Sequence, residues 1–167
     1  MKSRSEYFYC SPGKPAGITE IDEIYGCISN IQWQRSFSWR NREKNYSHQK
    51  AYNKAFEYYF SEKSWQLQPK LYNKPKLIGD FQKNGIFVEV QFGNSATLYR
   101  DYYKFHYGFV NRLLSLAVLI VPMKPKEFFP TRPKSVSNMA EFDLARRYFD
   151  LLPIPVPILL LGLLPEN

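Results

Sequence analysis

Apolar and polar residues alternate along residues 77–92, and this pattern predicts the two strands of a β-hairpin. The dipeptide Asn84-Gly85 lies between the strands and is strongly favoured in two-residue hairpin turns. Closing the chain there pairs Phe81 with Val88 and places Asp80 opposite Glu89. Side chains alternate between the two faces of a strand. One face therefore carries the apolar residues Phe81, Ile86, Val88, Val90 and Phe92, and the other the polar residues Asp80, Gln82, Glu89 and Gln91.

The rest of the chain contains helical periodicity, continuous apolar runs and irregular stretches. Helices are expected over 20–31, 47–60, 95–110 and 138–151, with Thr19 and Asn138 as N-caps, and further strands over 65–72, 116–121 and 156–161. Residues 1–17 are expected to form an extended arm or loop, and 33–46 and 122–133 to be irregular. The prediction is a single α/β domain over 1–167, with a mixed five-stranded sheet flanked by helices.

The two opposed carboxylates are the strongest sign of chemistry in the chain. Directly opposed residues on neighbouring strands have Cβ atoms roughly 4.5–5.5 Å apart, and like charges there destabilise the pair. Asp80 and Glu89 therefore need a compensating cation, and a hard divalent ion such as Mg²⁺ prefers oxygen ligands. The alternative is a solvated hairpin face, on which acidic residues are common.

The residues Asp80-Phe81, Lys83, Val88-Glu89-Val90-Gln91-Phe92 and Asn94 resemble the BglII–BstYI group of type II restriction endonucleases. That group is a branch of the PD-(D/E)XK nucleases in which Gln replaces the usual Lys, and the similarity extends over 65–164. It implies a PD-(D/E)XK nuclease-like core that hydrolyses phosphodiester bonds of double-stranded DNA with Mg²⁺ and leaves 5′-phosphates. It also implies a homodimer, a palindromic site for which a GATC-containing hexanucleotide is the first guess, and a cognate DNA methyltransferase as genetic partner.

The resemblance also assigns a role to each site residue. Asp80, Glu89 and the backbone carbonyl of Val90 would hold the metal, and Gln91 would position the attacking water. Gln68, aligned through Trp65, would help to hold that water. Without the resemblance, Gln91 is an ordinary polar strand residue, and a structural Gln68 on a strand is about equally plausible.

Two further sets of residues are candidates for contact with DNA. Asn94, Ser137 and Asn138 would read base edges, since Asn can bind adenine through N6 and N7; the alternative is that the two Asn side chains cap turns or helices. Basic residues in two segments suit phosphate contact, although a solvated basic surface explains them nearly as well. They are Arg35, Arg40 and Arg42 in the first segment, and Lys124 and Lys134 in the second.

Composition supports a polyanionic partner without proving one. The chain has 23 Lys and Arg against 15 Asp and Glu, a formal charge of +8. The apolar stretch 151–164 is too short and proline-rich to span a membrane, so a soluble cytoplasmic protein with two unpaired thiols is expected. The competing functions are a repair or phage nuclease without sequence specificity, and a catalytically silent DNA-binding module.

Overall fold

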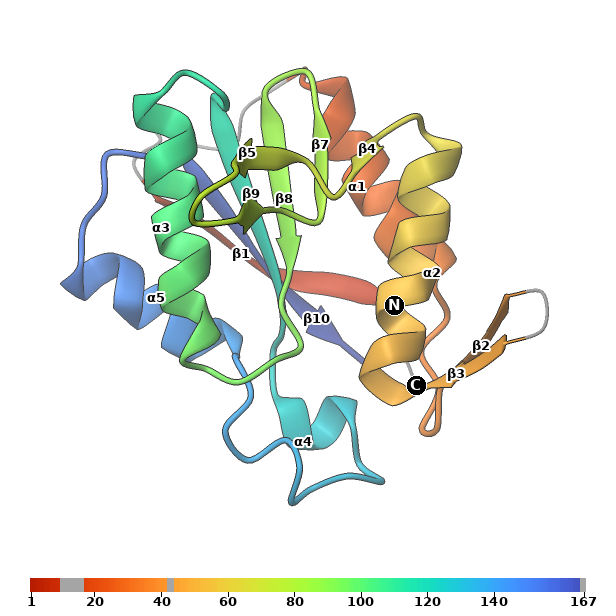
Figure 1. The fold of residues 1–167 in the computed structure, drawn as a ribbon. Coiled ribbons are helices and arrows are strands. Elements are labelled where there is room, and N and C mark those ends of the chain that lie inside the picture. Colours follow the sequence, from red (N-terminus) through yellow and green to blue (C-terminus); the bar gives the residue numbers. More distant parts are fainter. Residues whose placement is uncertain (10–16, 42–43, 166–167) are drawn as a thin grey trace.

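A mixed sheet of six strands lies between two layers of helices (Figure 1). The computed structural model describes residues 1–9, 17–41 and 44–165. In spatial order the strands are β1 (Lys2–Tyr9), β10 (Ile158–Leu164), β9 (Leu116–Pro122), β8 (Ile86–Val90), β7 (Phe81–Lys83) and β4 (Gln66–Leu67). The three central strands, β8 to β10, are parallel, whereas β1, β7 and β4 pair antiparallel with their neighbours. The predicted fold class is confirmed, and β1 adds a strand to the five expected.

Helices cover both faces of the sheet and bury it. Helices α1 (Thr19–Asn30) and α2 (His48–Glu62) pack on one face, and α3 (Thr97–Val110) and α5 (Phe142–Leu151) on the other (Figure 1). Alternate residues of β9 illustrate the division, since Val118 lies in the first core and Leu119 in the second. A strand buried on both faces needs a continuous apolar sequence, which explains the run from Leu116 to Pro122.

The hairpin formed by β7 and β8 has the predicted register, with Phe81 paired to Val88 and Lys83 to Ile86. Both turn residues have positive φ angles, 47° at Asn84 and 79° at Gly85, as a type I′ turn requires. The apolar face of the hairpin belongs to the core under α1 and α2, as predicted. Its members are Phe81, Ile86, Val88, Val90 and Phe92.

Several predicted boundaries are wrong. Residues 2–9 are not a free arm, because β1 pairs with β10, while residues 10–16 lie outside the described part of the chain. The segment 33–46 is not irregular: it contains the hairpin of β2 (Ser38–Asn41) and β3 (Lys44–Ser47), which packs on α2. The short helix α4 (Pro125–Phe128) interrupts the predicted loop 122–133.

The predicted strand 65–72 is divided into β4 and β5 (Lys70–Tyr72), and β5 pairs with β6 (Leu77–Ile78) in a separate small sheet. The break falls at Gln68, whose φ is 50°, and at Pro69, which has no N–H to donate. The predicted caps also differ. Ile18 precedes α1 and Glu141 precedes α5, so neither Thr19 nor Asn138 is an N-cap.

Two smaller findings concern the cysteines and membrane spans. Cys27 is a buried free thiol, and Cys10 lies among the residues that the structure does not describe. No helix in the described ranges has the length and apolarity needed to cross a bilayer.

Candidate active site

Asp80 and Glu89 lie together at the end of the hairpin. The β7–β8 ladder ends at Phe81 and Val88, so Asp80, which directly precedes β7, and Glu89 of β8 are the next residues beyond it. The Asp80 carboxylate accepts a hydrogen bond from the backbone N–H of Val90, with 2.8 Å between Oδ2 and N. That bond fixes the Asp80 carboxylate beside β8, next to the position of Glu89 to which the sequence assigned it.

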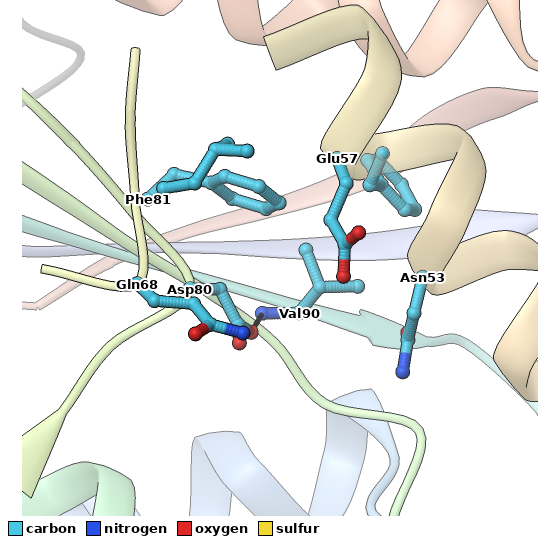
Figure 2. Close-up of a pocket in the computed structure, with 8 residues that line it drawn as sticks. Asn53, Glu57, Gln68, Asp80, Phe81 and Val90 are labelled. Carbon is cyan, nitrogen blue, oxygen red and sulfur yellow. Dashed lines mark hydrogen bonds between the residues drawn. The ribbon is translucent and has the colours of Figure 1, made fainter. Parts of the chain in front are cut away.

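A cavity of about 270 Å³ opens beside Asp80 (Figure 2). The loop between β4 and β5 contributes Gln68, whose backbone N–H donates to the carbonyl of Asp80 at 2.9 Å. Helix α2 contributes Asn53 and Glu57, and Figure 2 shows the Glu57 side chain pointing toward the strand end that carries Asp80 and Val90. Gln68 and Asp80 therefore line the same cavity, and the resemblance implied that they lie near each other.

Glu89 points into a buried network rather than into this cavity. Its Oε1 lies 2.6 Å from Nζ of Lys104 on α3, and Lys104 also lies 2.8 Å from Oδ1 of Asp101. The other oxygen of Asp101 accepts a hydrogen bond from Nε2 of Gln91 at 2.7 Å. The Gln91 side-chain oxygen accepts from the backbone N–H of Gly93 at 2.8 Å, so both ends of this amide are engaged.

Burial and like charge both oppose ionisation of the acid pair. Burial raises the pKa of Asp80, against the hydrogen bond from Val90, and it raises the pKa of Glu89 well above its usual value, with the Asp80 charge adding to the effect. Burial lowers the pKa of Lys104, but the carboxylates of Glu89 and Asp101 outweigh it and the net shift is upward. The ammonium is therefore charged, and the raised pKa values of Asp80 and Glu89 favour their protonated forms unless another cation is present.

The donor atoms at this position fit a hard divalent cation. Carboxylate and carbonyl oxygens are the ligands that Mg²⁺ prefers, and Asp80, Glu89 and the Val90 carbonyl supply them. In the described parts of the chain no three acidic, His or Cys side chains gather closely enough to hold a metal by themselves. A cation here would therefore depend on backbone or amide oxygens as well as on the carboxylates.

Three of the residues predicted to read bases lie around one hollow. Asn94 and Met139 form an isolated β-bridge, and the backbone N–H of Ser95 donates to the carbonyl of Asn138 at 2.7 Å. The hollow beside this bridge is lined by the exposed residues Asn94, Lys134, Ser137 and Asn138, among others. The segments after β8 and before α5 thus form one polar surface.

Local hydrogen bonds partly occupy these side chains. Asn94 Oδ1 accepts from the N–H of Ala96 at 2.9 Å, which is the turn role considered for it, and the Ser137 hydroxyl donates to the carbonyl of Lys134 at 3.0 Å. Asn94 also lines the hollow. The two roles are compatible, because an Asx turn uses only the side-chain oxygen.

The predicted phosphate-binding residues are distributed over two regions. Lys124 pairs with Glu127 at 3.0 Å and lines a neighbouring hollow that also contains Ser137 and Asn138. Arg35 and Arg40 are exposed near the β2–β3 hairpin and line neither hollow. Arg42 lies outside the described residues.

Sequence reasoning missed three charged residues of the site: Glu57, Asp101 and Lys104. The buried face of α3 contains Leu98, Asp101, Tyr102, Lys104 and Phe105. Charged residues on the apolar face of an amphipathic helix were the available sign, because such residues are buried only when they are paired. The sequence offers no comparable sign for Glu57.

Comparison with known proteins gives the family. A family model described as restriction endonuclease BglII/BglIII matches residues 16–163. A crystal structure of restriction endonuclease BglII complexed with a DNA 16-mer is similar over 99% of this chain and 79% of that chain, with a TM-score of 0.79 and 16% sequence identity. No curated protein matches the chain. Because the family model covers most of its length, the chain belongs to the BglII/BglIII family of restriction endonucleases, which confirms the resemblance and the predicted enzyme class, a type II site-specific deoxyribonuclease.

Proposed function

We propose that this protein is a Mg²⁺-dependent restriction endonuclease that hydrolyses both strands of a short palindromic DNA site, with Asp80 and Glu89 at its centre. Restriction endonucleases of this kind generally need divalent metal ions. The observation that supports the proposal is the hydrogen bond from the N–H of Val90 to Asp80, which holds the Asp80 carboxylate beside the residue that follows Glu89. Two carboxylates held this way make a site of concentrated negative charge that a cation would stabilise.

Asp80, Glu89 and the carbonyl of Val90 would hold the ion. When bound, a divalent cation supplies Lewis acidity toward a water molecule and the scissile phosphate, and it offsets negative charge that develops on phosphorus oxygens. The protein's own contribution is to fix these oxygens, since the Val90 N–H holds one oxygen of Asp80 and Lys104 holds one oxygen of Glu89. Fixed donors need little reorganisation during the reaction.

Gln68 is better placed than Gln91 to position the attacking water. Its side chain lines the cavity that contains Asp80, and it lies on a loop whose positive φ, 50°, is sparsely populated by non-glycine residues. Backbone strain of this kind occurs most often at functional sites. Both the NH₂ group and the oxygen of the Gln91 side chain already form hydrogen bonds, to Asp101 and Gly93. This arrangement fits a residue that connects the site to Gly93 better than one that binds water.

Double-stranded DNA is the proposed substrate and a homodimer the proposed active form. The similar structure of BglII is a complex with DNA, and a two-fold symmetric dimer suits a palindromic site. Asn94, Ser137 and Asn138 would contact base edges from their common surface, while Lys134, Lys124, Arg35, Arg40 and Arg42 would contact phosphates. A GATC-containing hexanucleotide stays the first guess for the site. We expect this single nuclease domain to act in the cytoplasm, with a cognate DNA methyltransferase as its genetic partner.

Digestion of a sequenced plasmid tests the proposal. With Mg²⁺ the protein should give discrete fragments whose ends all map to one short palindrome and carry 5′-phosphates, and EDTA should abolish cleavage. The variant Asp80→Ala should be inactive. A smear would instead indicate a nuclease without sequence specificity, and retention of activity by Asp80→Ala would show that cleavage comes from elsewhere in the preparation.

A further inference from the structure

Lys104 is the least expected charged residue near the candidate active site. It lies on α3 with only 2% of its surface exposed, and Lys is almost never buried to that degree unless it is paired. Its Nζ lies 2.6 Å from Glu89 Oε1, 2.8 Å from Asp101 Oδ1 and 3.3 Å from the carbonyl of Ile78. An ammonium has three hydrogens to donate, so these three partners satisfy it.

The contacts of Lys104 extend to both ends of the site. On one side it holds Glu89, which directly precedes Val90, the residue that donates to Asp80. On the other it holds Asp101, whose second oxygen binds the amide of Gln91, and Gln91 in turn binds the N–H of Gly93. Gly93 directly precedes Asn94, so one chain of contacts connects Glu89 to the surface proposed to read bases.

We propose that Lys104 is the internal counter-cation of this site: it holds Glu89 and, through Asp101, Gln91 in position before a divalent ion arrives. This inference rests on the proposed function. The carboxylates of Glu89 and Asp101 contact the one ammonium, and those of Asp80 and Glu57 lie close by at the cavity, so the site keeps a net negative charge when these groups are ionised. A divalent cation would offset part of that negative charge, and Lys104 sets how much of it the ion meets.

The charge balance predicts how ion binding responds to substitution. Lys104→Met keeps a side chain of similar length but leaves the carboxylates without this ammonium, and it removes the repulsion between the ammonium and the incoming ion. Asp101→Asn has the opposite effect, because it removes one negative charge while the Lys104 contact with Glu89 can persist. Ion affinity should therefore rise in the first variant and fall in the second, whereas a purely structural ion pair gives no reason for opposite signs.

Isothermal titration of the DNA-free protein with Mg²⁺ measures this directly, and no turnover is involved. We expect Lys104→Met to bind Mg²⁺ at least about tenfold more tightly than the unmodified protein, and Asp101→Asn about tenfold more weakly, as roughly one unit charge at close range dictates. In EDTA, Lys104→Met should melt at a lower temperature than the unmodified protein. Adding Mg²⁺ should raise the melting temperature of Lys104→Met by more than it raises that of the unmodified protein.

Lys83→Met provides the matched control. Lys83 also forms a partly buried ion pair, with Glu23 at 2.8 Å, but belongs to the far side of the hairpin. This variant should lose stability with no change in Mg²⁺ affinity. If Lys104→Met does not fold, Asp101→Asn carries the test alone.

Each outcome bears on one of the two proposals or on both. Equal or weaker binding by Lys104→Met, or unchanged binding by Asp101→Asn, overturns the role of Lys104 while the proposed function stands, provided that Asp80→Asn still abolishes binding. Binding that survives Asp80→Asn, or no binding by any form, overturns the proposed ion site and with it the role of Lys104.

Discussion

Replacing Asp80 with Asn should stabilise the metal-free protein while it removes cleavage. Asn has nearly the same shape as Asp, and its side-chain oxygen can accept the hydrogen bond that Val90 N–H now donates to Asp80 at 2.8 Å. The substitution removes a charge that burial and the neighbouring acids disfavour, as the raised pKa of Asp80 indicates. A residue kept for function at a cost in stability behaves in this way.

The expected magnitude follows from opposing charge interactions. Two unit charges about 5 Å apart interact by roughly 3 kcal/mol at an effective dielectric constant of about 20. In Asp80→Asn the lost repulsion from Glu89 stabilises the fold and the lost attraction to Lys104 destabilises it, so these two effects nearly cancel. What remains is that no charge at position 80 has to be buried or held near Asp101 and Glu57. We expect a net gain of about 1–2 kcal/mol, which raises the melting temperature of a domain this size by roughly 2–8 °C.

Asp80→Ala is the matched variant. It removes the same charge but also the acceptor for the Val90 N–H, and an unsatisfied buried donor costs about 1–3 kcal/mol. Asp80→Ala should therefore be less stable than Asp80→Asn by about that amount. Both variants should cleave at least about a hundredfold more slowly, because the metal would lose a ligand that stabilises the transition state by several kcal/mol.

Thermal and urea unfolding in EDTA, followed by tryptophan fluorescence, give the stabilities, and plasmid digestion with Mg²⁺ gives the rates. Near-normal cleavage by Asp80→Asn would refute the assignment of Asp80. If Asp80→Asn is less stable than Asp80→Ala, the side chain at position 80 does not accept a stabilising hydrogen bond from the Val90 N–H, and the reasoning is refuted.

Three more predictions concern pH, base recognition and salt. Because the folded-state pKa of Asp80 is raised, its protonated form favours folding, so the stability gained by Asp80→Asn should be small near pH 4 and grow as pH rises; a gain that shrinks contradicts this. Asn94→Ala should lower the kcat/KM ratio between cognate and single-mismatch sites about ten- to a hundredfold, and an unchanged ratio excludes base contact. Log Kd for DNA should change linearly with log salt, and Lys134→Ala should reduce the slope by about one unit; equal slopes exclude phosphate contact by Lys134.

The part of the site that the sequence could predict is the part that local structure determines. Asn84-Gly85 fixes the turn and hence the register, and the register places Asp80 beside Glu89 and Val90 with no contribution from the rest of the chain. The continuous apolar run of β9 likewise identifies a strand buried on both faces. These features depend on neighbours within a few residues, which a single sequence displays.

The rest depends on contacts between residues far apart in the sequence. β1 is a strand because it pairs with β10, more than a hundred residues away, and nothing local in its sequence indicates that partner. Asn138 could cap a helix by its residue type, but it lies in a turn that leads into the bridge between Asn94 and Met139, and α5 begins only at Phe142. Lys104 comes to Glu89 only when α3 packs on the sheet.

Crystals grown with Mn²⁺ in place of Mg²⁺ test the central claim most directly, because the anomalous scattering of manganese locates the ion. We predict an anomalous difference peak within bonding distance of carboxylate oxygens of Asp80 and Glu89 and of the Val90 carbonyl. A protein that cleaves DNA in Mn²⁺ and yet shows no peak there, or binds the ion elsewhere, would contradict the account.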